Sequence, residues 1–89
     1  MVNIDEVWPR IEAHAGETFR QIKGGEFIYT VEHGHVYVSR TPERIPKSHF
    51  EKALGLVPLI NTVPLQKKFR GPSFIYAILM DERIRQGDW

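Results

Sequence analysis

Basic side chains gather in the middle of this sequence, where they could bind a polyanion. Residues 40–70 hold seven basic and two acidic side chains, a net charge of +5, whereas residues 1–39 carry −3 and residues 71–89 carry −1. Such asymmetry is typical of a phosphate-contacting surface, although a solvated helix with its flanking loops produces it too. The candidate nucleic-acid-binding residues are Arg40, Arg44, Lys47, Ser48, His49, Lys52, Lys67, Lys68 and Arg70.

Part of this set lies at the predicted start of a helix. The pattern Ser48-x-x-Glu51 is typical of a capping box. Unpaired N–H groups at such a start could bind a phosphate with help from Arg44, Lys47 and Ser48. An ordinary cap with solubilising neighbours explains the same residues.

A second cluster of charge, Lys67-Lys68-Phe69-Arg70, includes one aromatic ring. The charges could meet a nucleic-acid backbone while the ring stacks on a base. Burial in the core is the competing interpretation for Phe69, because aromatic side chains bury readily.

The sequence contains no recognisable catalytic motif. The absence of cysteine excludes disulfides, thiolate metal ligands and cysteine nucleophiles. His33-Gly34-His35, beside Glu32, has metal-like spacing but is typical of an exposed hairpin turn. Adjacent carboxylates such as Asp5-Glu6 diverge on a helix, and no glycine-rich phosphate loop occurs. We therefore predict a nonenzymatic binding domain without a cofactor or a metal.

The elements that must position the basic residues begin with an antiparallel meander over residues 18–41. Two glycine-centred turns, at 23–25 and 33–34, interrupt a run of aromatic and β-branched residues. A two-residue turn at 33–34 puts the apolar side chains of the flanking strands on one face. The predicted pairs are Val31 with Val36, Tyr29 with Val38 and Phe27 with Arg40.

The first turn of the meander allows two registers. A three-residue loop with Gly25 in the left-handed conformation pairs Phe19 with Tyr29 on the covered face. A two-residue loop turns Phe19 away from that face. We prefer the three-residue loop because it lets Phe19 be covered.

Helices are predicted to cover this face of the meander. The first begins at Asn3 or Asp5 and ends near His14, the second begins at Ser48, and the third begins at Gly71-Pro72-Ser73 with Ser73 as its cap. Residues 55–71 contain two prolines and are predicted to form an ordered lid of short extended pieces. The lid is expected to bury its aliphatic residues, Leu56, Leu59, Ile60, Val63 and Leu65. The prediction is one α+β domain over residues 1–89, with a three-stranded antiparallel meander covered on one face by an N-terminal, a middle and a C-terminal helix.

A resemblance covers about residues 16–56. The segments Thr18-Phe19, Gly25-x-Phe27-x-Tyr29-x-Val31 and Arg44-Ile45-Pro46-x-Ser48-x-Phe50-x-x-Ala53-Leu54 resemble small accessory domains of bacterial restriction, helicase and defence proteins. The resemblance implies contact with DNA. The matching positions for phosphate contact are Arg40, Arg44, Lys47, Ser48 and His49.

The alternative is a protein-interaction module, such as an inhibitor or subunit of a phage or bacterial defence system. It would use Ile28, Tyr37 and Trp89 to bind a protein partner or a second copy of itself. Either module is expected in the cytoplasm and away from membranes, because the sequence shows neither a signal peptide nor an apolar run of membrane-spanning length.

Overall fold

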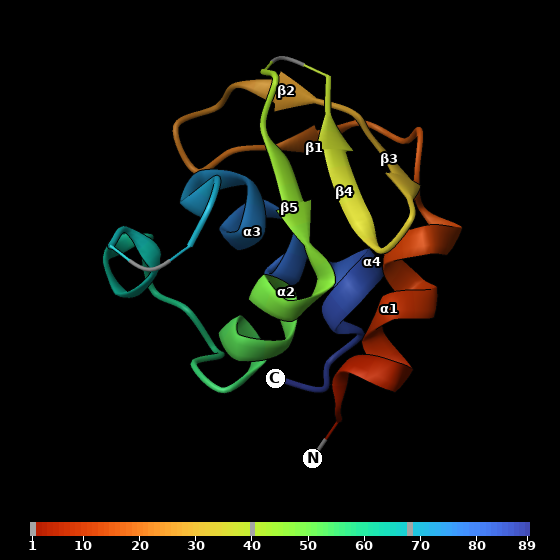
Figure 1. The fold of residues 1–89 in the computed structure, drawn as a ribbon. Coiled ribbons are helices and arrows are strands. Elements are labelled where there is room, and N and C mark those ends of the chain that lie inside the picture. The colour runs from red at the N-terminus through yellow and green to blue at the C-terminus, as the bar shows by residue number, and fades with distance from the viewer. Residues whose placement is uncertain (1, 40, 68) are drawn as a thin grey trace.

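The computed structural model describes residues 2–39, 41–67 and 69–89 and has an α+β fold (Figure 1). Its sheets are antiparallel, one of two strands and one of three. The elements, in chain order, are α1 (Ile4–Ala13), β1 (Phe19–Arg20), β2 (Glu26–Phe27), β3 (Tyr29–Glu32), β4 (His35–Val38), β5 (Arg44–Pro46), α2 (Lys47–Leu54), the 3₁₀ helix η1 (Val63–Leu65), α3 (Pro72–Leu79) and α4 (Glu82–Arg85).

The second hairpin has the predicted register. Tyr29 pairs with Val38 and Val31 with Val36, and the turn is formed by His33 and Gly34 with φ of 51° and 73°. Both turn residues adopt the positive φ that two-residue hairpin loops favour. The alternation of the flanking strands therefore fixed which face is buried.

The first hairpin differs from the prediction. Phe19 pairs with Phe27, so residues 21–25 form a longer loop, and Gly24 rather than Gly25 has a positive φ, 95°. A shift of two residues preserves the side on which a strand residue points. Phe19 is consequently buried as expected, although its partner is Phe27 and not Tyr29. The strand partner predicted for Phe27, Arg40, lies outside the described residues.

The third strand of the larger sheet was not predicted. The prediction of one continuous meander over 18–41 is wrong, because β5 comes from the proline-bracketed connection and pairs with β4. Ile45 is fully buried opposite Val36, and the proline at Pro46 is tolerated because β5 is an edge strand.

The first helix begins directly after Asn3, one of its two predicted starts. Asn3 accepts hydrogen bonds through Oδ1 from the backbone N–H groups of Asp5 and Glu6, at 2.9 and 3.2 Å. Trp8 is buried on the covered side of this helix, with its ring edge-on to Phe50 at a centroid distance of 5.9 Å. Trp8 is therefore a core residue of α1.

The two serine caps that the sequence predicts are wrong. Helix α2 begins at Lys47 with Pro46 as its N-cap and no side-chain cap, so Ser48 lies inside the helix. Helix α3 has Gly71 as its N-cap, and the Ser73 Oγ instead accepts a hydrogen bond from Gln21 Nε2 at 2.9 Å. Each helix therefore starts after a residue with a non-helical backbone conformation, which is extended at Pro46 and left-handed at Gly71.

The segment between α2 and α3 is only partly a lid. Leu59 and Leu65 are buried, but the side chains of Leu56, Ile60 and Val63 are 44%, 87% and 65% exposed. The turn η1 replaces the expected extended pieces. The expected burial of all five aliphatic residues is therefore wrong. Within η1, a single helical turn directs Leu65 inward and leaves Val63 outward.

The C-terminal residues close the domain against its first half. Arg83 donates to Asp81, to Glu17 Oε1 and to the backbone oxygen of Thr18, and its guanidinium lies 3.9 Å from the Phe19 ring centroid. The predicted single last helix is divided into α3 and α4, because Asp81 caps α4. No helix in the described part of the chain is both long and apolar enough to cross a membrane.

Candidate nucleic-acid interface

Two basic segments that are far apart in the sequence meet through His49. Its Nδ1 accepts a hydrogen bond from the backbone N–H of Arg70 at 3.1 Å. Its ring also meets Phe69 edge-on, at a centroid distance of 5.7 Å and an interplanar angle of 87°. Because His49 belongs to α2, these contacts hold the chain around residue 70 against that helix.

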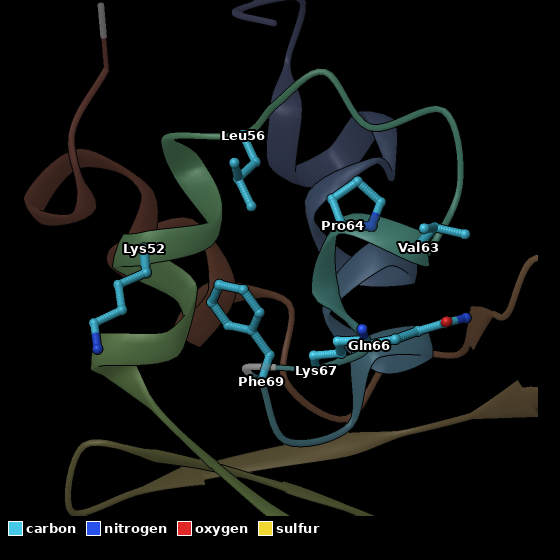
Figure 2. A pocket seen from close by; sticks show the side chains of 7 residues that line it. All are labelled: Lys52, Leu56, Val63, Pro64, Gln66, Lys67 and Phe69. Carbon is cyan, nitrogen blue, oxygen red and sulfur yellow. The ribbon is translucent and has the colours of Figure 1, made fainter.

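A hollow of about 580 Å³ lies beside this contact (Figure 2). The ring of Phe69 lies between α2 and the η1 segment in the view. Lys52 comes from α2 and Lys67 from the chain that follows η1. The lining residues are Lys52, Leu56, Val63, Pro64, Gln66, Lys67 and Phe69.

The electrostatics of this face are positive. Partial burial lowers the pKa of His49, and the nearby charges of Lys52 and Arg70 lower it further. Lys52, Lys67 and Arg70 are exposed, and within the described ranges the ion pairs involve other cations. We name the surface formed by His49, Lys52, Lys67 and Arg70 the basic face.

Other predicted residues do not join the basic face. Lys47 Nζ lies 3.9 Å from Asp5 Oδ1 and 5.8 Å from the Trp8 ring centroid, so this side chain is directed toward α1. Arg44 is exposed on β5 opposite Tyr37. Ser48 is exposed in the first turn of α2. Two further candidates, Arg40 and Lys68, lie outside the described residues.

The three residues of the alternative interface do not share one surface. Ile28 and Tyr37 line a shallow hollow of about 160 Å³ on the larger sheet. Trp89 lines a different hollow and is partly buried, since its Nε1 donates to the Leu79 backbone oxygen at 2.8 Å. Trp89 is thus tied to the fold of its own chain.

Sequence reasoning missed the apolar part of the hollow. The predicted lid over the core includes Leu56, Val63 and Pro64, and the prediction gives Gln66 no role. Pro58 and Pro64 interrupt the helical pattern here, which signals irregular backbone but not its outward-facing side chains. In the described part of the chain, no group of three His, Asp or Glu side chains could hold a metal ion.

Neither a protein-family model, nor a curated protein, nor a solved structure matches this chain. The geometry of the basic face therefore carries the functional argument.

Proposed function

We propose that this domain is a nonenzymatic nucleic-acid-binding module that contacts mainly the DNA backbone. The observation that carries the proposal is that cations from two segments meet at α2: Lys52 and Arg70 lie near His49, and Lys52 and Lys67 line the same hollow. Exposed cations on one surface neutralise phosphates and release counterions, which is the main source of sequence-independent affinity.

The charge distribution supports an oriented encounter with DNA. Residues 1–39 carry a net charge of −3, and their acidic side chains include Asp5 and Glu6 in the first turn of α1. A positive face on a domain whose acidic side chains belong to other elements would steer the domain so that the basic face meets the polyanion first. The resemblance to accessory domains of bacterial restriction and defence proteins agrees with such a role, which we place in the cytoplasm.

Fluorescence anisotropy of a labelled DNA duplex at several salt concentrations tests this proposal. If the three cations of the basic face neutralise three phosphates, log affinity falls against log salt with a slope of about −2.7, and affinity drops roughly 40-fold between about 50 and 200 mM salt. Substitution Lys67→Glu should weaken binding and reduce the slope by about one unit or more.

A matched control separates the basic face from net charge. Arg44 is exposed on β5 opposite Tyr37 and does not line the hollow, so Arg44→Glu makes the same change in charge away from the basic face. We expect this variant to retain most of the affinity. Equal losses in both variants would mean that only overall charge matters, and flat titrations of the unaltered domain at micromolar concentration would reject DNA binding.

A protein-interaction module is the second candidate. The exposed side chains of Leu56 and Val63, which line one hollow, favour it, because exposed apolar groups that lie together mark protein contacts. As an inhibitor or subunit of a phage or bacterial defence system, the domain would associate with a protein or with itself. Sedimentation at low and high salt distinguishes this reading, since apolar association tolerates salt and phosphate binding does not.

A further inference from the structure

Phosphate contacts leave the apolar part of the hollow unused. Leu56 and Val63 are 44% and 65% exposed, Pro64 is exposed, and Phe69 is partly exposed beside them. Water-exposed apolar groups that line a concavity are typical of a binding site. The volume of about 580 Å³ lies within the usual range for small-ligand sites, about 300–1,000 Å³.

The aromatic ring in the hollow is fixed before any ligand arrives. Phe69 is held by its edge-on contact with His49, and the neighbouring Arg70 backbone is held by the His49 Nδ1. A ring that is already positioned loses little conformational freedom when a flat partner stacks on it. Pro64 adds a second apolar ring to the lining (Figure 2).

The rim of the hollow offers polar groups of two kinds. Lys52 and Lys67 supply positive charge. The second kind is the amide of Gln66, which donates through Nε2 to Thr62 Oγ1 at 3.3 Å and is directed away from the Phe69 ring in Figure 2.

We infer that the hollow holds an unpaired base of a single-stranded nucleic acid, with the flanking phosphates on Lys52 and Lys67. This inference rests on the proposed function and narrows its ligand. A base inside a duplex cannot enter the hollow, because both of its faces are stacked. An acidic peptide would use the lysines and the aliphatic lining, whereas a base also stacks on the face of the Phe69 ring.

The test compares three labelled ligands of equal phosphate number: a single strand of thymidines, a strand of abasic sugar-phosphate units, and a duplex. We expect the thymidine strand to bind about 5- to 150-fold more tightly than the abasic strand, the range measured for one stacked base. We also expect it to bind more tightly than the duplex. Measurement by anisotropy at one low salt concentration keeps the phosphate contribution constant.

Two variants locate the effect. Phe69→Leu should weaken binding of the thymidine strand by about 5- to 150-fold, because the stacking ring is lost. It should leave binding of the abasic strand unchanged. Phe74→Leu is the matched control, because Phe74 is also partly exposed but packs against Phe27 at 4.9 Å between ring centroids. Thermal melting establishes that each variant is folded. If Phe69→Leu unfolds the domain, the affinities of the three ligands for the unaltered chain still test whether the hollow binds a base.

The outcomes separate this inference from the proposed function. Salt-dependent binding that is equal for the thymidine and abasic strands, or tighter for the duplex, overturns the base-binding hollow and leaves backbone binding intact. No binding to any of the three ligands overturns both. Binding only to an acidic amphipathic peptide, lost in Phe69→Leu, would assign the hollow to a protein partner and also overturn both.

Discussion

Removal of the His49 side chain should loosen the contact that brings the two basic segments together. His49→Ala deletes the hydrogen bond from the Arg70 N–H, 3.1 Å long, and the edge-on contact with Phe69. A hydrogen bond contributes about 0.5–1.5 kcal/mol and an aromatic pair about 0.5–1.5 kcal/mol. Because His49 is partly exposed, we expect a loss of about 1–2 kcal/mol in the free energy of unfolding, or roughly 4–15 °C in Tm for a domain of this size.

The variant His49→Asn tests which part of the side chain matters. The Asn Oδ1 occupies nearly the position of the His Nδ1, so it can accept the same hydrogen bond without the ring. We expect this variant to recover about half of the lost stability. DNA affinity should fall more in His49→Ala than in His49→Asn, because the first variant also frees the segment that carries Arg70.

The contribution of His49 should depend on pH. Its pKa is lowered in the folded protein, chiefly by partial burial, so protonation occurs first in the unfolded chain. The stabilisation is therefore complete above the unfolded value of about 6.5 and is lost as the pH falls toward the lower folded value. Protonated Nδ1 also cannot accept the Arg70 N–H.

Thermal unfolding followed by circular dichroism at pH 7.5 and 5.5 measures both effects. His33→Asn is the control, because His33 is exposed in the hairpin turn and Asn tolerates its φ of 51°. The difference between the unaltered chain and His49→Ala should shrink at pH 5.5. A difference that is zero at pH 7.5, or that grows at pH 5.5, refutes the reasoning.

Three further predictions concern the scaffold of the basic face. Tyr29→Phe leaves the Ile11 backbone oxygen without the buried hydroxyl that donates to it at 2.6 Å, and urea unfolding should show a loss of about 1–3 kcal/mol; an unchanged midpoint would contradict this. Gly71→Ala places a methyl group 3.0 Å from Ile45 Cδ1 at a φ of 55°, so we expect a loss of about 1–3 kcal/mol, and a smaller one for Gly24→Ala, which meets no atom within 4 Å; equal melting temperatures for the two variants would exclude the steric explanation. Arg83→Met removes the guanidinium from Phe19 and Asp81 and should cost about 1–2 kcal/mol at pH 7. The hydrogen bonds from Arg83 lower the pKa of Asp81, so this stabilisation is present above the ordinary carboxyl pKa and is lost as the pH falls through the lowered value; an effect of equal size at pH 3 and 7 would show that packing alone matters.

Local signals in the sequence predicted the parts of the fold that depend on neighbouring residues. The His33-Gly34 turn and the alternation around it gave the register of β3 with β4. Asn3 marked the start of α1 because its side chain caps the adjacent N–H groups. In both cases the deciding contacts join residues within a few positions of each other.

The predictions that failed depend on contacts between distant residues or on backbone geometry at the start of a helix. The strand β5 is held by pairing with β4 and by burial of Ile45, which override the proline signals on either side. The serines expected to cap α2 and α3 lie inside those helices, because backbone geometry at Pro46 and Gly71 sets the helix starts. Residue types alone could not reveal the strand β5 or the true starts of α2 and α3.

The sequence predicted which segment carries the basic residues of the candidate site, but not how these residues are arranged in space. Charge counting selected residues 40–70, but the contact between His49 and Arg70 spans 21 positions and could not be inferred from spacing. The same count included Lys47, which interacts with Asp5 and Trp8 of the first helix. The exposed aliphatic residues were mistaken for core because hydrophobicity alone does not distinguish a core from a hollow.

The closeness of Val2 and Trp89 makes the chain topologically suited to circular permutation. Both residues line the same hollow with Leu54. A short glycine-rich linker could therefore join them, while new ends are opened in the exposed loop between β1 and β2. Neither cut nor linker touches the residues of the basic face, so a permuted domain would present the same surface from a different point of attachment.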